Sequence, residues 1–168
     1  MLHNQSLHKL LKPITHQYPL PSDLPNPTVS GLALHSNQVA ENTVFFACTG
    51  NTYNGSHFIE NAIQKGATVI ITQTDLANIS WTCKQGKNKT ILFVHIPNLK
   101  HQLSAMANQF YNQPSHHFPV IGVTGTNGKT SVCHLTAQAL TAMNQKAAII
   151  GTAGSGLWPN HEAQSLTT

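Results

Sequence analysis

The sequence predicts an α/β protein built from two parts. Short apolar segments with the pattern of buried strands alternate with segments whose apolar residues recur at helical spacing, which is typical of α/β folds. A stretch rich in Asn, Pro and His interrupts this alternation just before residue 120. In a chain of 168 residues we therefore expect a small α/β domain over residues 1–113, a linker over 114–119 and the beginning of a second α/β domain over 120–168.

The first domain begins with a short amphipathic helix around Leu7, Leu10 and Leu11, followed by a proline-rich connector. Four strands are then expected, over residues 29–34, 43–48, 67–72 and 90–94. Ser56 is a candidate N-cap for a helix that ends at Gly66, and Asn98 is a candidate N-cap for a second helix. The apolar face of that second helix carries Leu99, Leu103, Met106 and Phe110.

The second domain reads as strand, glycine-rich turn, helix and strand. Residues 120–124 have the pattern of a buried strand, and residues 147–150 have the same pattern. The helix between them is indicated by Val132, Leu135, Ala139, Leu140 and Met143. Three glycines follow the last strand, at 151, 154 and 156, and they fit either a ligand-binding loop at a strand end or a flexible connector.

The composition excludes several classes of function. All nine basic residues are lysine, so this chain supplies no arginine finger. The net charge is only +4, and the lysines are scattered, so we expect no nucleic-acid partner. Eleven histidines show no spacing typical of a metal site. Three cysteines without CxxC spacing, and no apolar run long enough to span a membrane, predict a cytoplasmic protein without a membrane partner.

Residues 122–130, GVTGTNGKT, carry the clearest chemistry. Glycines at a strand-to-helix turn leave backbone N–H groups free to converge on a polyphosphate, and Gly125 and Gly128 can adopt the positive φ angles that such a turn demands. Lys129 would bring an ammonium to the terminal phosphates, and the Thr130 hydroxyl would bind Mg²⁺. The predicted nucleotide-binding residues are Gly125, Thr126, Asn127, Gly128, Lys129, Thr130 and Ser131. A tight turn without a ligand is the alternative, because the general phosphate-loop pattern has glycine where this chain has Val123.

This loop resembles the ATP loop of the Mur ligases of peptidoglycan synthesis, which has the same glycine spacing. A Gly-Thr-x-Gly-x-Gly stretch at residue 151 is similar to that family as well, and the pair Thr126 and Asn127 looks most like the E-type branch, the tripeptide synthetases. Residues 44–67 resemble the family's N-terminal domain, which binds the uridine nucleotide of UDP-N-acetylmuramoyl (UDP-MurNAc) peptides. The resemblance thus implies a nucleotide-sugar domain followed by a P-loop-type ATPase domain.

This chain has fewer of the implied substrate-binding residues than the family pattern contains. Where the family has Asp-Ser-Arg, this chain has His35, Ser36 and Asn37, so only Ser36 matches. The remaining candidates for binding the nucleotide sugar are Asn51, Thr52, Tyr53, Thr167 and Thr168.

The implied activity is formation of an amide bond at the expense of ATP, with Mg²⁺ as cofactor and Lys129 as the catalytic residue. A diamino acid, meso-diaminopimelate or L-lysine, would be added to UDP-N-acetylmuramoyl-L-alanyl-D-glutamate by a monomeric enzyme. Glu162 is the only acidic residue after the loop, so the carboxylate ligands that Mg²⁺ needs are missing. We therefore expect these 168 residues to be an inactive N-terminal portion of a longer ligase.

Other readings share some of these features. The F-type Mur ligases and the folate polyglutamate ligases have a related loop, although the uridine-type segment argues against the folate enzymes. A nucleotide-binding module without catalysis would explain the missing acids. A dinucleotide oxidoreductase using the glycines at 151–156 is disfavoured, because no acidic residue lies about 20 positions beyond them.

Overall fold

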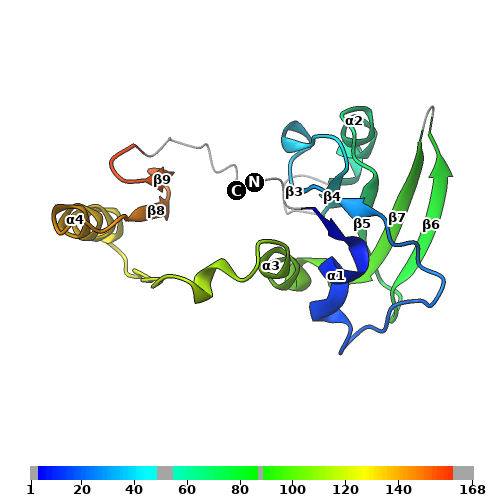
Figure 1. The fold of residues 1–168 in the computed structure, drawn as a ribbon, viewed down its shortest axis with the longest axis horizontal. Helices are drawn as coiled ribbons and strands as arrows, with labels where there is room; N and C mark the ends of the chain where they lie inside the picture. The colour runs from blue at the N-terminus through cyan, green and yellow to red at the C-terminus, as the bar shows by residue number, and fades with distance from the viewer. Residues whose placement is uncertain (1–3, 49–54, 87–88, 161–168) are drawn as a thin grey trace. The chain divides into compact units, whose positions relative to one another are not determined.

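The computed structural model describes residues 4–48, 55–86 and 89–160. The chain divides into two compact units, Met1–Phe118 and Pro119–Thr168. Both units contain helices and strands (Figure 1), which confirms the predicted α/β class. The division falls within the predicted linker, between Phe118 and Pro119.

Unit 1 is built on a five-stranded sheet. Its order is β3 (Gly31–Ala33), β4 (Thr43–Ala47), β5 (Val69–Thr74), β7 (Thr90–Pro97) and β6 (Ser80–Gln85). The first four strands are parallel and the edge strand β6 is antiparallel to β7. The apolar patterns predicted the four parallel strands but not β6, whose side chains are mostly polar and exposed.

The predicted strand over residues 29–34 is divided in two. The first part is β2 (Thr28–Val29), which pairs with β1 (Gln5–Ser6) in a separate two-stranded sheet. Only the second part, β3, joins the main sheet. The Ser30 N–H donates to the Asn42 carbonyl instead of continuing either ladder, so the chain changes partners at this residue.

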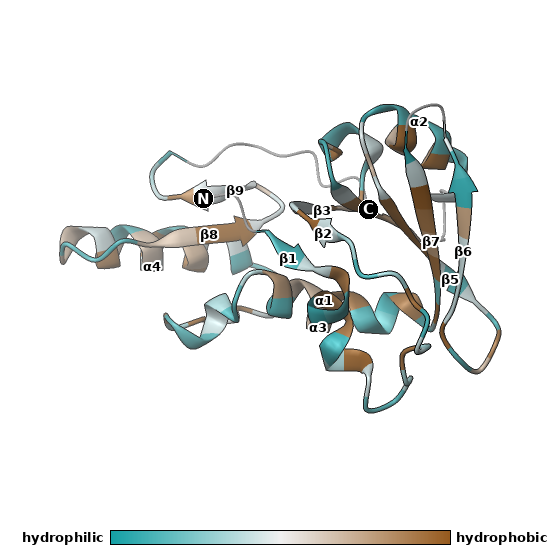
Figure 2. Ribbon diagram, turned by 45° about the vertical axis from the view of Figure 1, so that its right-hand side comes forward, coloured by the Kyte–Doolittle hydropathy of each residue, from teal (hydrophilic) through white to brown (hydrophobic). Residues whose placement is uncertain are grey.

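Helices cover both faces of the main sheet. One face packs against α1 (Leu7–Leu11), the 3₁₀ turn η1 (Lys12–Ile14) and α3 (Leu99–Phe110), and their leucines join the larger apolar cluster. The other face packs against α2 (Ile59–Gln64), where a smaller cluster forms (Figure 2). Three further 3₁₀ turns are η2 (Ser36–Gln38), η3 (Gly55–Phe58) and η4 (Pro114–His116).

The two predicted helix caps differ from expectation. Ser56 lies within η3, and Phe58 occupies the N-cap position of α2. Asn98 is at the N-cap of α3, but its φ is 48° and its side chain makes no capping bond. Instead its amide donates to the Tyr18 hydroxyl at 3.3 Å, so it ties α3 to the segment that follows η1.

Unit 2 contains α4 (Lys129–Ala142) and a hairpin of β8 (Ala148–Gly151) and β9 (Gly154–Leu157). The prediction of a buried strand at residues 120–124 is wrong. Val120 is 70% exposed, and the segment joins no ladder, because no described strand of unit 2 lies alongside to accept its hydrogen bonds. The strand predicted at 147–150 does form, as β8, but only Ile149 in it is buried.

The glycines after β8 form a hairpin turn. Gly151 pairs with Gly154 across two residues, and Gly154 has a φ of 125°. The turn therefore joins antiparallel strands and does not follow a strand of a parallel sheet. Among the described residues, no helix is long and apolar enough to cross a membrane.

Candidate functional site

The glycine-rich turn of unit 2 has the backbone conformation that the sequence predicts. Residues 125–128 bend sharply just before α4 begins, with φ of 143° at Gly125 and 76° at Gly128. Residues other than glycine rarely adopt these φ angles. Gly128 occupies the N-cap position of α4, so the turn ends directly at the N-terminus of a fourteen-residue helix.

The turn offers several backbone donors without partners. Within the described residues, the N–H groups from Gly125 to Ser131 make no hydrogen bond, and the first paired amide is that of Val132, which donates to the Gly128 carbonyl at 2.9 Å. Residues 124–132 are exposed. Unpaired N–H groups at a helix N-terminus carry partial positive charge, so this surface favours an anion.

Lys129 reaches back over the turn. Its Nζ donates to the Gly125 carbonyl at 2.6 Å and to the Thr126 carbonyl at 3.1 Å. These bonds hold the turn curled and place an ammonium beside the unpaired N–H groups. An anion bound there would meet both kinds of donor.

The same turn offers less to a metal ion. The Thr130 hydroxyl lies at the second residue of α4 and is exposed, as its predicted role requires. Within the described residues, no group of three His, Cys, Asp or Glu side chains could hold a metal. Mg²⁺ is commonly held by one or two carboxylates together with substrate phosphates and waters, so a single hydroxyl supplies only part of such a set.

The predicted uridine site lies only partly within the described residues. Ser36 is half-buried at the start of η2, and the neighbouring Asn37 accepts a hydrogen bond of 2.9 Å from Lys65 Nζ. Asn51, Thr52 and Tyr53, like Thr167 and Thr168, lie outside the described residues.

The two described residues that flank residues 49–54 are joined by a hydrogen bond. The Gly55 N–H donates to the Cys48 carbonyl at 2.9 Å, and a Cβ at Gly55 would lie 2.6 Å from that oxygen. Glycine is therefore required where the chain returns to the carboxyl end of β4. Burial raises the pKa of the Cys48 thiol although Lys100 acts in the opposite direction, so this cysteine is not an activated nucleophile.

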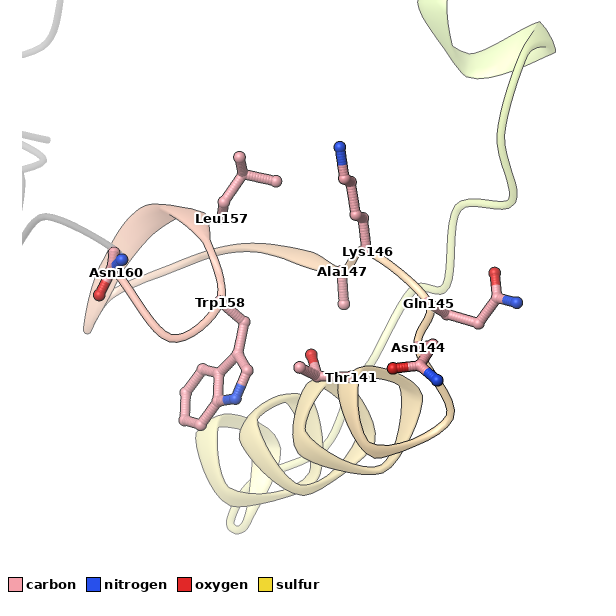
Figure 3. Close-up of a pocket in the computed structure, with 8 residues that line it drawn as sticks. All are labelled: Thr141, Asn144, Gln145, Lys146, Ala147, Leu157, Trp158 and Asn160. Carbon is pink, nitrogen blue, oxygen red and sulfur yellow. The ribbon is translucent and has the colours of Figure 1, made fainter.

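Two features were missed by the sequence analysis. Thr72 Oγ1 and His95 Nδ1 are joined by a 2.6 Å hydrogen bond near the carboxyl ends of β5 and β7. No local pattern indicates this pair, because its members lie on different strands. The second feature is a cavity of about 380 Å³ at the C-terminal end of α4 (Figure 3). It is lined by Thr141, Asn144, Gln145, Lys146, Ala147, Leu157, Trp158 and Asn160.

Comparison with known families identifies the chain. A family model described as "Mur ligase family, catalytic domain" matches residues 28–111, which is half of the chain. A second model, "Mur ligase middle domain", matches residues 123–168. This chain belongs to the Mur ligase family. The predicted family is thus confirmed, and the two matches lie in units 1 and 2 respectively.

Two curated relatives share the name UDP-N-acetylmuramoyl-L-alanyl-D-glutamate--2,6-diaminopimelate ligase. That of Haemophilus influenzae is 32% identical over 154 residues, covering 88% of this chain and 30% of the relative. That of Xanthomonas oryzae pv. oryzae is 34% identical over 168 residues, covering 100% of this chain and 31% of the relative. The chain thus spans less than a third of the length of these curated Mur ligases.

Solved Mur ligase structures share the fold. A structure of a 2,6-diaminopimelate ligase of the same name matches with a TM-score of 0.57 at 24% identity, covering 89% of this chain and 29% of that one. MurF from Acinetobacter baumannii matches with a TM-score of 0.57 at 16% identity, covering 84% and 28%. At these identities the likeness shows the fold alone.

Proposed function

We propose that this chain supplies the nucleotide-sugar domain and the ATP loop of an ATP-dependent amide ligase of peptidoglycan precursor synthesis. The observation that supports the proposal best is the turn at residues 125–128, where unpaired N–H groups, a helix N-terminus and Lys129 all favour one anion. The names of the relatives favour UDP-N-acetylmuramoyl-L-alanyl-D-glutamate as the acceptor and diaminopimelate, in preference to lysine, as the added amino acid.

The proposed reaction forms one amide bond. ATP with Mg²⁺ would transfer its γ-phosphoryl group to the D-glutamate carboxylate, which gives an acyl phosphate and releases ADP. The amine of the diamino acid would then attack the acyl carbon, forming the amide and releasing phosphate and a proton. The N–H groups of the turn would hold the phosphates in one orientation. Lys129 would exchange its two carbonyl partners for phosphate oxygens and neutralise their charge, while Thr130 would offer its hydroxyl to the metal.

In unit 1, the carboxyl ends of the parallel strands would receive the uridine diphosphate. Ser36, after β3, and the segment after β4 are the candidates carried over from the family pattern. The family's arginine is replaced by Asn37, but Lys65 donates to that residue, so a cation remains at this position.

Binding without turnover by these 168 residues is the alternative. The described part of unit 2, residues 119–160, contains no Asp or Glu, so its only predicted Mg²⁺ ligand is the Thr130 hydroxyl. Mg²⁺ usually takes at least one carboxylate from the protein in such sites. We therefore expect the isolated chain to bind nucleotide but not to ligate.

Lys129→Ala tests the proposed loop. Removing the ammonium should weaken binding of ATP–Mg²⁺ by at least about tenfold, measured by calorimetric titration, because a charge-assisted contact is lost. Lys146→Ala is the matched control, since Lys146 is the other lysine of unit 2 and lies beyond the far end of α4. Equal ATP affinity in wild type and Lys129→Ala, with both chains folded, would overturn the assignment of the loop.

A further inference from the structure

The strand register of unit 1 places three polar residues side by side, in a row that starts from the apolar Ala47. Ala47 pairs with Thr72, Thr72 with His95, and His95 with Ser80. Two residues earlier, the corresponding row contains Phe45, Ile70 and Phe93, which belong to the cluster under α2. Because residues two apart on a strand share a face, the polar row lies on the same face. The row thus interrupts an apolar face just where the parallel strands end.

Thr72 and His95 form the central pair of this row. Thr72 and His95 are both half-buried, and a hydrogen bond of 2.6 Å joins the Thr72 hydroxyl to His95 Nδ1. Burial lowers the pKa of His95, which favours the neutral ring near pH 7. When the hydroxyl donates to Nδ1, the ring proton is on Nε2. Within the described residues Nε2 makes no hydrogen bond.

The position of the pair relates it to the proposed uridine site. Thr72 and His95 each lie two residues before the end of their strand, at the carboxyl edge of the sheet. Ser36 follows β3 at that edge, and Cys48, which follows β4 there, accepts a hydrogen bond from the Gly55 N–H. Ligands of open parallel sheets bind outside the carboxyl ends of the strands.

We infer that His95 is a specificity residue for the uracil base, donating from Nε2 to the O4 carbonyl, with Thr72 as the positioning residue that fixes the tautomer. This inference rests on the proposed function. A single neutral donor beside an apolar row suits the flat edge of a base, whereas a diphosphate requires cations and several N–H groups. O4 lies on the edge of the base away from the ribose, and it distinguishes uracil from cytosine, which carries an amino group there.

Titration of the whole chain with UDP and with CDP tests this role. The wild type should prefer UDP by about tenfold, the effect of one well-placed hydrogen bond with its partner left unpaired in the wrong ligand. His95→Leu should weaken UDP binding by about tenfold and leave CDP binding unchanged. His95→Gln keeps a side-chain N–H and should retain most of the preference. His16→Leu, at an exposed histidine of unit 1, is the control and should bind both like wild type.

Thr72→Val tests the positioning role separately. In ¹H–¹⁵N spectra of the imidazole rings, the wild-type His95 should show the Nε2–H tautomer, and its Nε2 signal should shift when UDP is added. Thr72→Val should mix the two tautomers and weaken UDP binding several-fold, while the thermal unfolding midpoint of the protein records any purely structural effect. A variant that loses packing but keeps the Nε2–H tautomer would contradict the role of Thr72.

The outcomes separate this inference from the proposed function. UDP binding that His95→Leu leaves unchanged, or equal losses of UDP and CDP affinity, would overturn the role of His95 and leave the uridine site standing. Absence of any UDP binding by the folded wild type would overturn the uridine site itself, and this inference with it.

Discussion

Gly122 and Gly125 belong to the same glycine-rich segment but differ in backbone conformation. An added Cβ would meet nothing within 4 Å at Gly122, and at Gly125 only the Asn127 carbonyl at 3.8 Å. Space is therefore available at both positions. Gly125, however, has a φ of 143°, whereas the φ of Gly122 lies outside the range that disfavours side chains. The conformation of the turn thus depends on Gly125 for backbone reasons alone.

Gly125→Ala should consequently disturb the turn without creating a clash. The unfavourable φ costs about 1–2 kcal/mol, and relief of this strain would move the N–H groups that the proposed site needs. We expect a loss of about tenfold in affinity for ATP–Mg²⁺ by calorimetry. Gly122→Ala is the matched control and should bind within about twofold of wild type. Equal losses in the two variants would mean that steric space, and not φ, limits this loop.

His95 also makes the stability of unit 1 depend on pH. Burial lowers its pKa in the folded state, so below the unfolded-state pKa the unfolded chain binds the proton more readily. The stability that depends on a neutral His95 ring is therefore fully present above the unfolded-state pKa, and it is lost as the pH falls through the folded-state pKa. Wild type should therefore lose more stability than His95→Gln between pH 7.5 and pH 5, measured by urea unfolding. If the free energy of unfolding falls equally with pH in wild type and His95→Gln, His95 does not contribute to the pH dependence.

The helices α3 and α4 have similar apolar periodicity but different environments. In α3 the side chains of Leu99, Met106 and Phe110 are buried in the larger cluster. In α4 only Ala137 is buried. Among the described residues of unit 2, seven large apolar side chains are exposed: Val120, Ile121, Val132, Leu135, Met143, Ile150 and Leu157. Helical spacing therefore predicts the helix in both cases, whereas burial depends on which elements pack against it.

Truncating one apolar side chain in each helix should show this difference. Met106→Ala removes a fully buried side chain and should lower the free energy of unfolding by about 2–5 kcal/mol. Leu135→Ala removes a side chain that is 64% exposed and should change it by less than about 0.5 kcal/mol. Urea unfolding followed by circular dichroism measures both. A large loss in Leu135→Ala would show that the apolar face of α4 is covered in solution.

The sequence predicted those features that depend on neighbouring residues. The positive φ angles at Gly125 and Gly128 and the helix beginning at Lys129 follow from a short local pattern, as do the four parallel strands. The pairing of Thr72 with His95 could not be predicted in this way, because these residues are 23 positions apart and meet only through the register of their two strands.

The misses have related causes. The strand β6 was missed because an exposed edge strand needs no apolar pattern. The segment at 120–124 has the composition of a buried strand, but a strand requires a partner, and within the described residues nothing pairs with it.

Considered as a whole, the chain has its apolar cores in unit 1. Both clusters of buried side chains, one on each face of the sheet, consist of residues before Phe118. Unit 2 contributes only Ala137 and Ile149 to the buried apolar residues that the structure describes. Because burial of apolar surface is the main stabilising term in folding, cooperative stability should reside in unit 1.

A chain comprising residues 1–118 should therefore fold alone. Its thermal midpoint should lie within about 4 °C of that of the whole chain, which corresponds to a change of roughly 1 kcal/mol in a domain of this size. In the whole chain, hydrogen exchange should be slower for the amides of α3 than for those of α4, because only the former lie against a core. The shorter chain should also bind UDP as the whole chain does, since Ser36, Thr72 and His95 all belong to it. An unfolded 1–118 chain, or equal exchange in the two helices, would show that residues after 118 complete the core.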